Sequence, residues 1–148
     1  MYFNGKDIEQ FQVQKQFIDT VIVPILNVSF ADATMRQSGS EAEFLMSLTA
    51  FIEQQFKGRL MLLPPFSYFE EAKETMDLQA IYQQLLDSGF KHVFFLTSDQ
   101  RFANEKEFPV VWLPAIPLES MDKTVKQRIL EDQLQQVVPI FTRAWTNA

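Results

Sequence analysis

Twice along this chain, a pattern typical of an amphipathic helix ends at a glycine, and a run of apolar residues follows. The helical pattern 51–57 ends at Gly58, before the apolar run 59–65, and a second ends at Gly89, before the run 91–97. A glycine directly after a helix can adopt the left-handed conformation that closes it. A strand that is apolar at nearly every position is buried on both faces, as in parallel sheets. The sequence therefore predicts a three-layer α/β/α fold, Rossmann-like or flavodoxin-like, with a mostly parallel sheet of about four strands.

Composition restricts the kinds of protein that this chain can be. Its 148 residues suit one α/β domain spanning 1–148, and an apolar share of 47% is enough to form a core. The net charge of −6 argues against nucleic acid and anionic membranes as partners. Cysteine is absent, which excludes disulfides, thiolate metal sites and cysteine nucleophiles. Because we find neither a signal peptide nor an apolar run of about 20 residues, we expect a cytoplasmic protein with no integral membrane segment.

Apolar periodicity and capping residues predict helices and strands along the chain. The predicted helices cover 5–18, 41–57, 77–88 and 119 or 120 to about 145, and the predicted strands cover 20–30, 59–65, 91–97 and 108–117. Asn4 and a capping box at Ser40–Glu43 begin the first two helices, with a loop over 31–39 before the second. Pro24 cannot donate a ladder hydrogen bond, which favours an edge position or a bulge for the first strand. Pro139 should kink the last helix.

Polar side chains follow two of the predicted strands. In open α/β sheets, ligands bind outside the carboxyl ends of the strands. Asn27 and Ser29 end the first predicted strand, and Thr97, Ser98 and Asp99 end the third. In a hydrolase-like enzyme Asp99 could be a nucleophile or a metal ligand, but serine and aspartate after a strand are also common turn formers. We favour the turn, because neither a partner histidine nor a second acidic residue stands at a spacing typical of a catalytic site.

The residues needed for several common chemistries are missing. Gly58 and Gly89 precede strands, whereas phosphate-binding glycines follow them. The single histidine, His92, begins the third predicted strand, at the end opposite the expected site. The carboxylates show no EF-hand or His-x-x-Glu spacing. We therefore assign no catalytic residue, metal ligand or cofactor, and we lean against an enzyme.

Prolines and large apolar side chains follow two other strands. Phe66 and Tyr68 come directly after Pro64-Pro65, and Ile116 lies between Pro114 and Pro117. If these segments are neighbours, they form a rigid apolar rim, and exposed patches of this kind mark binding surfaces. The alternative is that they pack as a satellite core beneath the loop 31–39.

Several segments resemble a family of known sequences. They are 6–9, 19–21, 56–66, 89–94 and 114–119. Together they resemble a small family of uncharacterised proteins from endospore-forming Gram-positive bacteria and their relatives, over essentially the whole chain. That family has no assigned activity, so the resemblance implies a single cytoplasmic domain of unknown function and transfers no catalytic residues.

Two hypotheses for the function follow from these observations. The first is a non-enzymatic accessory protein that binds another protein through the apolar rim. The alternative is a minimal hydrolase-like enzyme or small-ligand binder centred on Thr97, Ser98 and Asp99. Self-association through the last helix is a further hypothesis, because Trp145 lies near the end of the chain with little to pack against.

Overall fold

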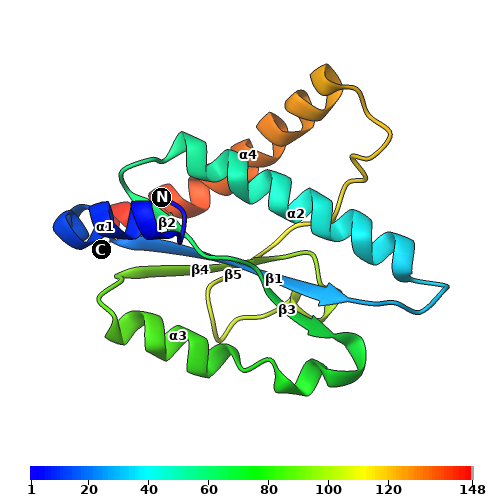
Figure 1. Ribbon diagram of the computed structural model, residues 1–148, viewed down its shortest axis with the longest axis horizontal. Helices are drawn as coiled ribbons and strands as arrows, with labels where there is room; N and C mark the ends of the chain where they lie inside the picture. The colour runs from blue at the N-terminus through cyan, green and yellow to red at the C-terminus, as the bar shows by residue number, and fades with distance from the viewer. Residues whose placement is uncertain (148) are drawn as a thin grey trace.

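In the computed structural model, which describes residues 1–147, five strands form one parallel sheet between two layers of helices (Figure 1). The strands are β1 (Thr20–Val28), β2 (Leu60–Leu62), β3 (Phe66–Phe69), β4 (His92–Thr97) and β5 (Val110–Trp112). Their order is β2-β1-β4-β5, and β3 pairs with β1 beyond the end of β2. The predicted three-layer α/β/α fold is therefore confirmed, with five strands in place of about four.

Four α-helices and three short 3₁₀ helices connect the strands. They are α1 (Gly5–Val13), η1 (Lys15–Phe17), α2 (Met35–Gln55), η2 (Glu70–Thr75), α3 (Leu78–Asp87), η3 (Gln100–Phe102) and α4 (Lys123–Thr146). Helices α2 and α4 cover one face of the sheet, and α3 covers the other (Figure 1). Helix α1 packs on the α3 side through Ile8 and Phe11. None of these helices, within residues 1–147, is long and apolar enough to cross a membrane.

The two glycines that predicted the fold have the backbone conformation expected of them. Gly58 follows α2 with φ +87°, and Gly89 follows α3 with φ +105°. Within residues 1–147 no other residue has a positive φ. The left-handed conformation at these two positions ends each helix and turns the chain toward the next strand.

Strand β1 occupies the centre of the sheet although it contains Pro24, so the expected edge position is wrong. The carbonyl of Ile22 accepts a hydrogen bond from Leu63 N at 3.0 Å, which shows that Ile22 faces the β2 side. Pro24, two residues later, faces the same side, because backbone groups alternate along a strand. The β2 ladder ends at Leu62 and the β3 ladder begins at Phe66, so Pro24 has no ladder partner to lose there.

Helix α2 begins at Met35, six residues before the predicted start at 41. The predicted loop over 31–39 is therefore only partly a loop, and the predicted capping box at Ser40–Glu43 is wrong, because both residues lie within the helix. The Ser38 hydroxyl joins the helix to the end of β1: it accepts a hydrogen bond from Ser29 N at 2.9 Å and donates one to Asn27 O at 3.1 Å.

The aromatic segment after Pro64-Pro65 is a strand, not the loop that the sequence predicts. Residues Phe66–Phe69 pair in parallel with Ile25–Val28 of β1. Tyr68 is only 5% exposed and packs in the core on the α3 side. Aromatic residues favour strands, but this strand forms only because β1 extends past β2 and offers it an unpaired edge.

Trp145 is packed within the monomer, which removes the reason for expecting self-association through the last helix. Its ring contacts Phe56 and Phe141, and its indole Nε1 donates a hydrogen bond to Thr20 Oγ1 at 2.8 Å. The guanidinium of Arg59 lies 4.1 Å from the ring centroid.

Helix α4 continues through Pro139. Pro139 has no backbone N–H to donate to the carbonyl of Gln135, four residues earlier. Gln135 is exposed, so water can donate a hydrogen bond to that carbonyl instead.

Candidate functional site

A cavity of about 390 Å³ lies at the carboxyl ends of β1 and β4. The chain leaves β1 through α2 to reach β2 on one side, and it leaves β4 to reach β5 on the other side. These diverging connections make the β1/β4 junction the switch point of the sheet, where ligands bind in folds of this class. The residues that line this switch-point cavity are Asn27, Ser29, Thr34, Gln37, Ser38, Glu41, Glu70, Ser98, Asp99 and Gln100.

The structure brings together most of the polar residues singled out in the sequence. Asn27 and Ser29 line the cavity from β1 and its following loop, and Ser98 and Asp99 line it from the loop after β4. Thr97 lies beneath them and is 1% exposed. Its hydroxyl donates to Ile25 O at 3.0 Å and accepts a hydrogen bond from Asp99 N at 3.0 Å. Thr97 therefore supports the site rather than facing it.

The Asp99 carboxylate is held by hydrogen bonds on both of its oxygens. One oxygen accepts a hydrogen bond from the Tyr68 hydroxyl, and the other accepts one from Arg101 N at 3.0 Å. The second contact is the turn that the sequence predicts, so Asp99 both forms the turn and lines the cavity. Burial and the bond to Asp99 raise the pKa of the Tyr68 hydroxyl well above its usual value. Tyr68 thus stays protonated and keeps donating to Asp99.

Helix α2 supplies a second wall of the cavity. The hydroxyls of Ser29 and Thr34 lie 2.6 Å apart, which joins the loop after β1 to the start of the helix. One turn further on, Gln37 Nε2 donates to Glu41 Oε1 at 3.2 Å. Burial raises the pKa of the Glu41 carboxyl, the bond from Gln37 opposes this in part, and the charge of Asp99 raises the pKa further. Glu41 is therefore held in an environment that disfavours its charged form.

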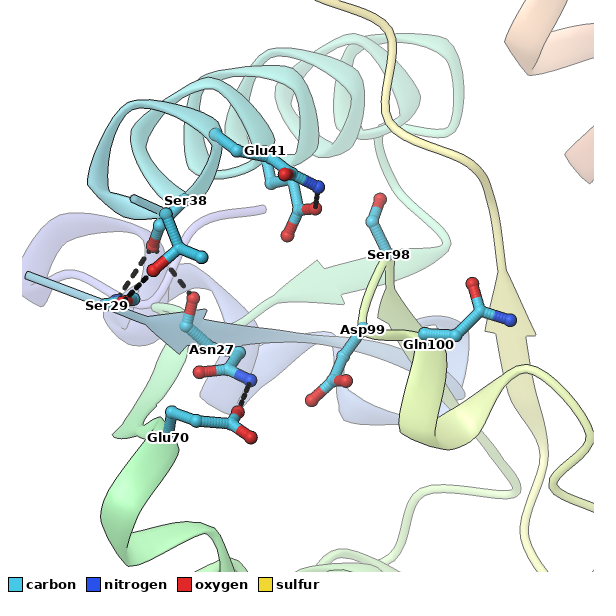
Figure 2. A pocket seen from close by; sticks show the side chains of 10 residues that line it. Asn27, Ser29, Ser38, Glu41, Glu70, Ser98, Asp99 and Gln100 are labelled. Atoms are coloured by element: carbon cyan, nitrogen blue, oxygen red, sulfur yellow. Dashed lines mark hydrogen bonds between the residues drawn. The ribbon is translucent and has the colours of Figure 1, made fainter. Parts of the chain in front are cut away.

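The η2 helix supplies the third wall through Glu70. Asn27 Nδ2 donates a hydrogen bond to the Glu70 carboxylate, and Lys73 Nζ lies 3.2 Å from it. These two contacts, the bond from Asn27 first, lower the pKa of Glu70. Figure 2 shows the carboxylates of Glu41, Glu70 and Asp99 pointing from three different elements toward the space between them.

Two oxygens at the cavity wall are buried without a hydrogen-bond partner among residues 1–147. They are Asn27 Oδ1 and Ser98 Oγ. A buried polar atom without a partner carries a desolvation penalty of about 1–3 kcal/mol, and sites that bind ligands or water often contain such atoms. The switch-point cavity therefore has hydrogen-bonding capacity that the described protein does not use.

The two halves of the predicted apolar rim are not neighbours. Phe66 lies on β3 at one edge of the sheet and is 38% exposed, whereas Ile116 follows β5 at the opposite edge. Three strand spacings, about 14 Å, separate these edges. Ile116 packs against the core on the α2 and α4 side, and Tyr68 packs on the α3 side. Phe66 and Ile116 therefore do not form one rim.

Sequence reasoning missed Glu41, Glu70 and Gln37 as residues of the site. Glu41 lies within the predicted capping box, and Glu70 lies in the segment before the predicted helix over 77–88, where the sequence shows no site pattern. Had the helix been started at Met35, the spacing of Gln37, Ser38 and Glu41 would have placed them on one helical face toward the strand ends. The contact between Asn27 and Glu70 joins residues 43 positions apart, and no local pattern predicts it.

Comparison with known proteins places the chain among uncharacterised relatives. The sequence profile of a family described as "Protein of unknown function (DUF2487)" matches residues 9–145. The chain is 26% identical over 142 residues to "Uncharacterized protein YpiF" of Bacillus subtilis (strain 168), an alignment that covers 95% of each chain. No solved structure matches. These matches confirm the resemblance to a small uncharacterised family of Bacillus-type bacteria.

Proposed function

Because this chain belongs to the DUF2487 family, whose description names no activity, we propose a function from the site alone: the protein binds a small polar ligand at the β1/β4 switch point. The observation that carries this proposal is the switch-point cavity of about 390 Å³ with two unpartnered buried oxygens in its wall. Pockets that hold small ligands begin at about 300 Å³ and use a few fixed polar groups for orientation. The proposal includes a cytoplasmic location, which fractionation of cells with an antibody would test.

Binding is proposed in preference to catalysis because, within residues 1–147, no hydrogen bond joins the Ser98 hydroxyl to a general base. Ser98 is the serine next to Asp99, but its hydroxyl is buried and unpartnered, whereas activation of a serine requires a neighbouring general base. His92, the chain's single histidine, begins β4 at the opposite end of the strand. Asp99 already accepts hydrogen bonds from Tyr68 and Arg101 on its two oxygens.

A thermal-shift screen tests the proposal directly. Purified protein is heated with nucleotides, sugars, amino acids, amines and small carboxylic acids. A ligand at about 100 times its dissociation constant adds about 2.7 kcal/mol to the free energy of unfolding. For a chain of this length that is a rise in Tm on the order of 5–10 °C.

A cavity-blocking variant identifies the site in the same screen. Ser98→Leu places a large apolar side chain at the cavity wall and should abolish the shift given by any ligand that binds there. Ser47→Leu, on α2 away from the lining residues, is the control. A screen without any shift, or a shift that Ser98→Leu leaves unchanged, would count against the proposal.

A second candidate function is the docking of another protein beside the cavity. Phe30 is 70% exposed and Phe69 is 53% exposed, and their ring centroids lie 6.3 Å apart. Each is adjacent in sequence to a cavity residue, Ser29 or Glu70. The test is chemical crosslinking in native cells with Phe30→Ser and Phe69→Ser variants. Phe17→Ser is the matched control, because Phe17 is 63% exposed on a different part of the chain. Crosslinks that all variants retain would remove this candidate.

A further inference from the structure

Two of the three carboxylates in the switch-point cavity have no cationic partner. Glu70 is paired with Lys73 at 3.2 Å. Among residues 1–147 neither Glu41 nor Asp99 forms an ion pair. No lysine, arginine or histidine is among the lining residues. The cavity therefore carries negative charge that the described part of the chain does not neutralise.

Charged and polar groups from several elements surround Glu41, and on the side of the loop before α4, Glu119 accepts a hydrogen bond from Ser40 at 3.3 Å. Asp99, on the loop after β4, and Glu70, on η2, line the same cavity, and Gln37 is the donor that Glu41 has on its own helix. Lys73 and Arg101, the cations that contact residues beside the cavity, have other partners. Lys73 binds Glu70, and the Arg101 guanidinium lies over the Tyr68 ring, 5.1 Å from its centroid, and donates to Lys73 O at 3.0 Å.

The neutral groups of the wall also favour a ligand that donates hydrogen bonds. Asn27 has already committed its amide N–H to Glu70, which leaves its buried Oδ1 as an acceptor without a donor. Ser98 Oγ is likewise buried and unpartnered, and it can accept. An ammonium or guanidinium group offers several N–H donors and no acceptor, which complements this wall.

The spacing of the carboxylates favours an organic cation over a metal ion. Within residues 1–147 no three His, Asp or Glu side chains lie close enough together to hold a metal ion. The carboxylates of Glu41 and Asp99 instead stand on different walls of a cavity of about 390 Å³. A ligand of several atoms can reach both, whereas a single ion needs its oxygen ligands at about 2.0–2.6 Å.

Building on the proposed function, we propose that the ligand of the switch-point cavity is a small organic cation with ammonium or guanidinium groups. Its positive charge pairs with Asp99 and Glu41, and its N–H groups donate to Asn27 Oδ1 and Ser98 Oγ. The bound cation favours the charged form of Glu41, so the Glu41 carboxyl loses its proton when the cation binds. The affinity for the cation therefore rises with pH.

The experiment compares four-carbon probes of matched length and different charge. Binding of putrescine, 1,4-butanediol and succinate is measured by calorimetry and thermal shift, with agmatine as the guanidinium probe. Putrescine or agmatine should bind, and the neutral diol and the dianion should not. Glu41→Gln and Asp99→Asn should each weaken cation binding roughly tenfold or more. Glu43→Gln on the same helix and Asp132→Asn on α4, both outside the cavity, should leave the affinity unchanged.

The possible outcomes separate this inference from the proposed function. Binding of succinate or butanediol without the cations, or binding of a sugar or nucleotide from the wider screen alone, would overturn the cation inference and leave the proposed function standing. Absence of binding by every compound would overturn both. If Asp99→Asn fails to fold by circular dichroism, Glu41→Gln decides the outcome, and unchanged cation affinity in that variant would overturn the inference.

Discussion

The hydroxyl of Tyr68, on β3, donates a hydrogen bond to the carboxylate of Asp99, which follows β4. Strand β1 lies between these two strands, so the bond spans three strands at the carboxyl edge of the sheet. Tyr68 is 5% exposed, and its ring is covered by the Arg101 guanidinium. The bond therefore fixes one carboxylate of the switch-point cavity from the core of the protein.

Removal of the Tyr68 hydroxyl should destabilise the protein. Tyr68→Phe leaves Asp99 with one donor fewer, and a hydrogen bond to a charged group contributes about 1.5–3 kcal/mol. Urea denaturation at pH 7 measures this loss. Tyr82→Phe is the control, because the Tyr82 hydroxyl forms no hydrogen bond within residues 1–147. Equal losses in the two variants would mean that the bond to Asp99 contributes nothing.

The same residue predicts an alkaline loss of stability. The pKa of Tyr68 is raised in the folded protein, so above about pH 10 the unfolded chain loses this proton first. The contribution of the group is complete below that pH and declines as the pH rises. The difference in free energy of unfolding between wild type and Tyr68→Phe should therefore shrink between pH 9 and pH 11, which denaturation curves at each pH can check.

Neutralisation of Glu41 should stabilise the protein near neutral pH. Burial raises the pKa of this carboxyl in the folded protein, so its contribution is most favourable at low pH and is lost as the pH rises through the raised pKa. The glutamine of Glu41→Gln does not ionise, so the stability of this variant does not fall for this reason as the pH rises. The variant should gain stability over wild type between pH 4 and pH 7, measured by urea denaturation at both. Such a gain is typical of residues kept for function rather than stability.

Glu43→Gln provides the comparison for that experiment, since Glu43 lies on the same helix and outside the cavity. A gain at Glu43 equal to that at Glu41 would attribute the effect to the net charge of the protein, not to the cavity.

Removal of the buried Glu53 carboxylate should change the free energy of unfolding by a larger amount. The Met1 ammonium lies 2.8 Å from Glu53 Oε2, and the Glu53 side chain is 2% exposed. Removing one partner of a buried ion pair costs about 3–5 kcal/mol, because the other charge stays buried and unpaired. Glu53→Gln should therefore lower the free energy of unfolding by several kcal/mol in urea. Glu9→Gln, an exposed change on α1, should have no measurable effect. A loss below 1 kcal/mol in Glu53→Gln would contradict the ion pair.

Local patterns predicted those parts of the fold that local chemistry determines. The strands around Phe95 and Met61 are apolar at nearly every position, and their fully buried positions between the helical layers follow from that. The start of α2 was missed because the apolar periodicity begins only at Phe44. Thr34 and Gln37 do match the Thr-x-x-Gln pattern of a capping box, although the Thr34 side chain caps no backbone amide. Strand β3 was missed because it depends on an edge of β1, about 40 residues away along the chain.

The sequence predicted only part of the site, because local patterns do not determine contacts between distant segments. The switch-point rule places Asn27 and Asp99 at one edge once the strands are known. Glu41 and Glu70 enter the cavity only through the start of α2 and through the bond from Asn27, and both depend on tertiary structure. The separation of Phe66 from Ile116 required the strand order, which the sequence does not contain.

Substitution by alanine should change the free energy of unfolding in opposite directions at Gly89 and at Gly39. Gly89 has φ +105°, and a Cβ there would meet nothing within 4 Å, so Gly89→Ala tests the backbone conformation alone. The left-handed region costs a residue with a Cβ about 1–2 kcal/mol, and the variant should lose that much stability. Gly39 lies inside α2, exposed, with open space around its Cβ position. Gly39→Ala should gain about 0.5–1 kcal/mol, because alanine favours helix and restricts the unfolded chain. Urea denaturation of the two variants measures both effects, and a loss at Gly39 as large as that at Gly89 would show that the helix does not include residue 39.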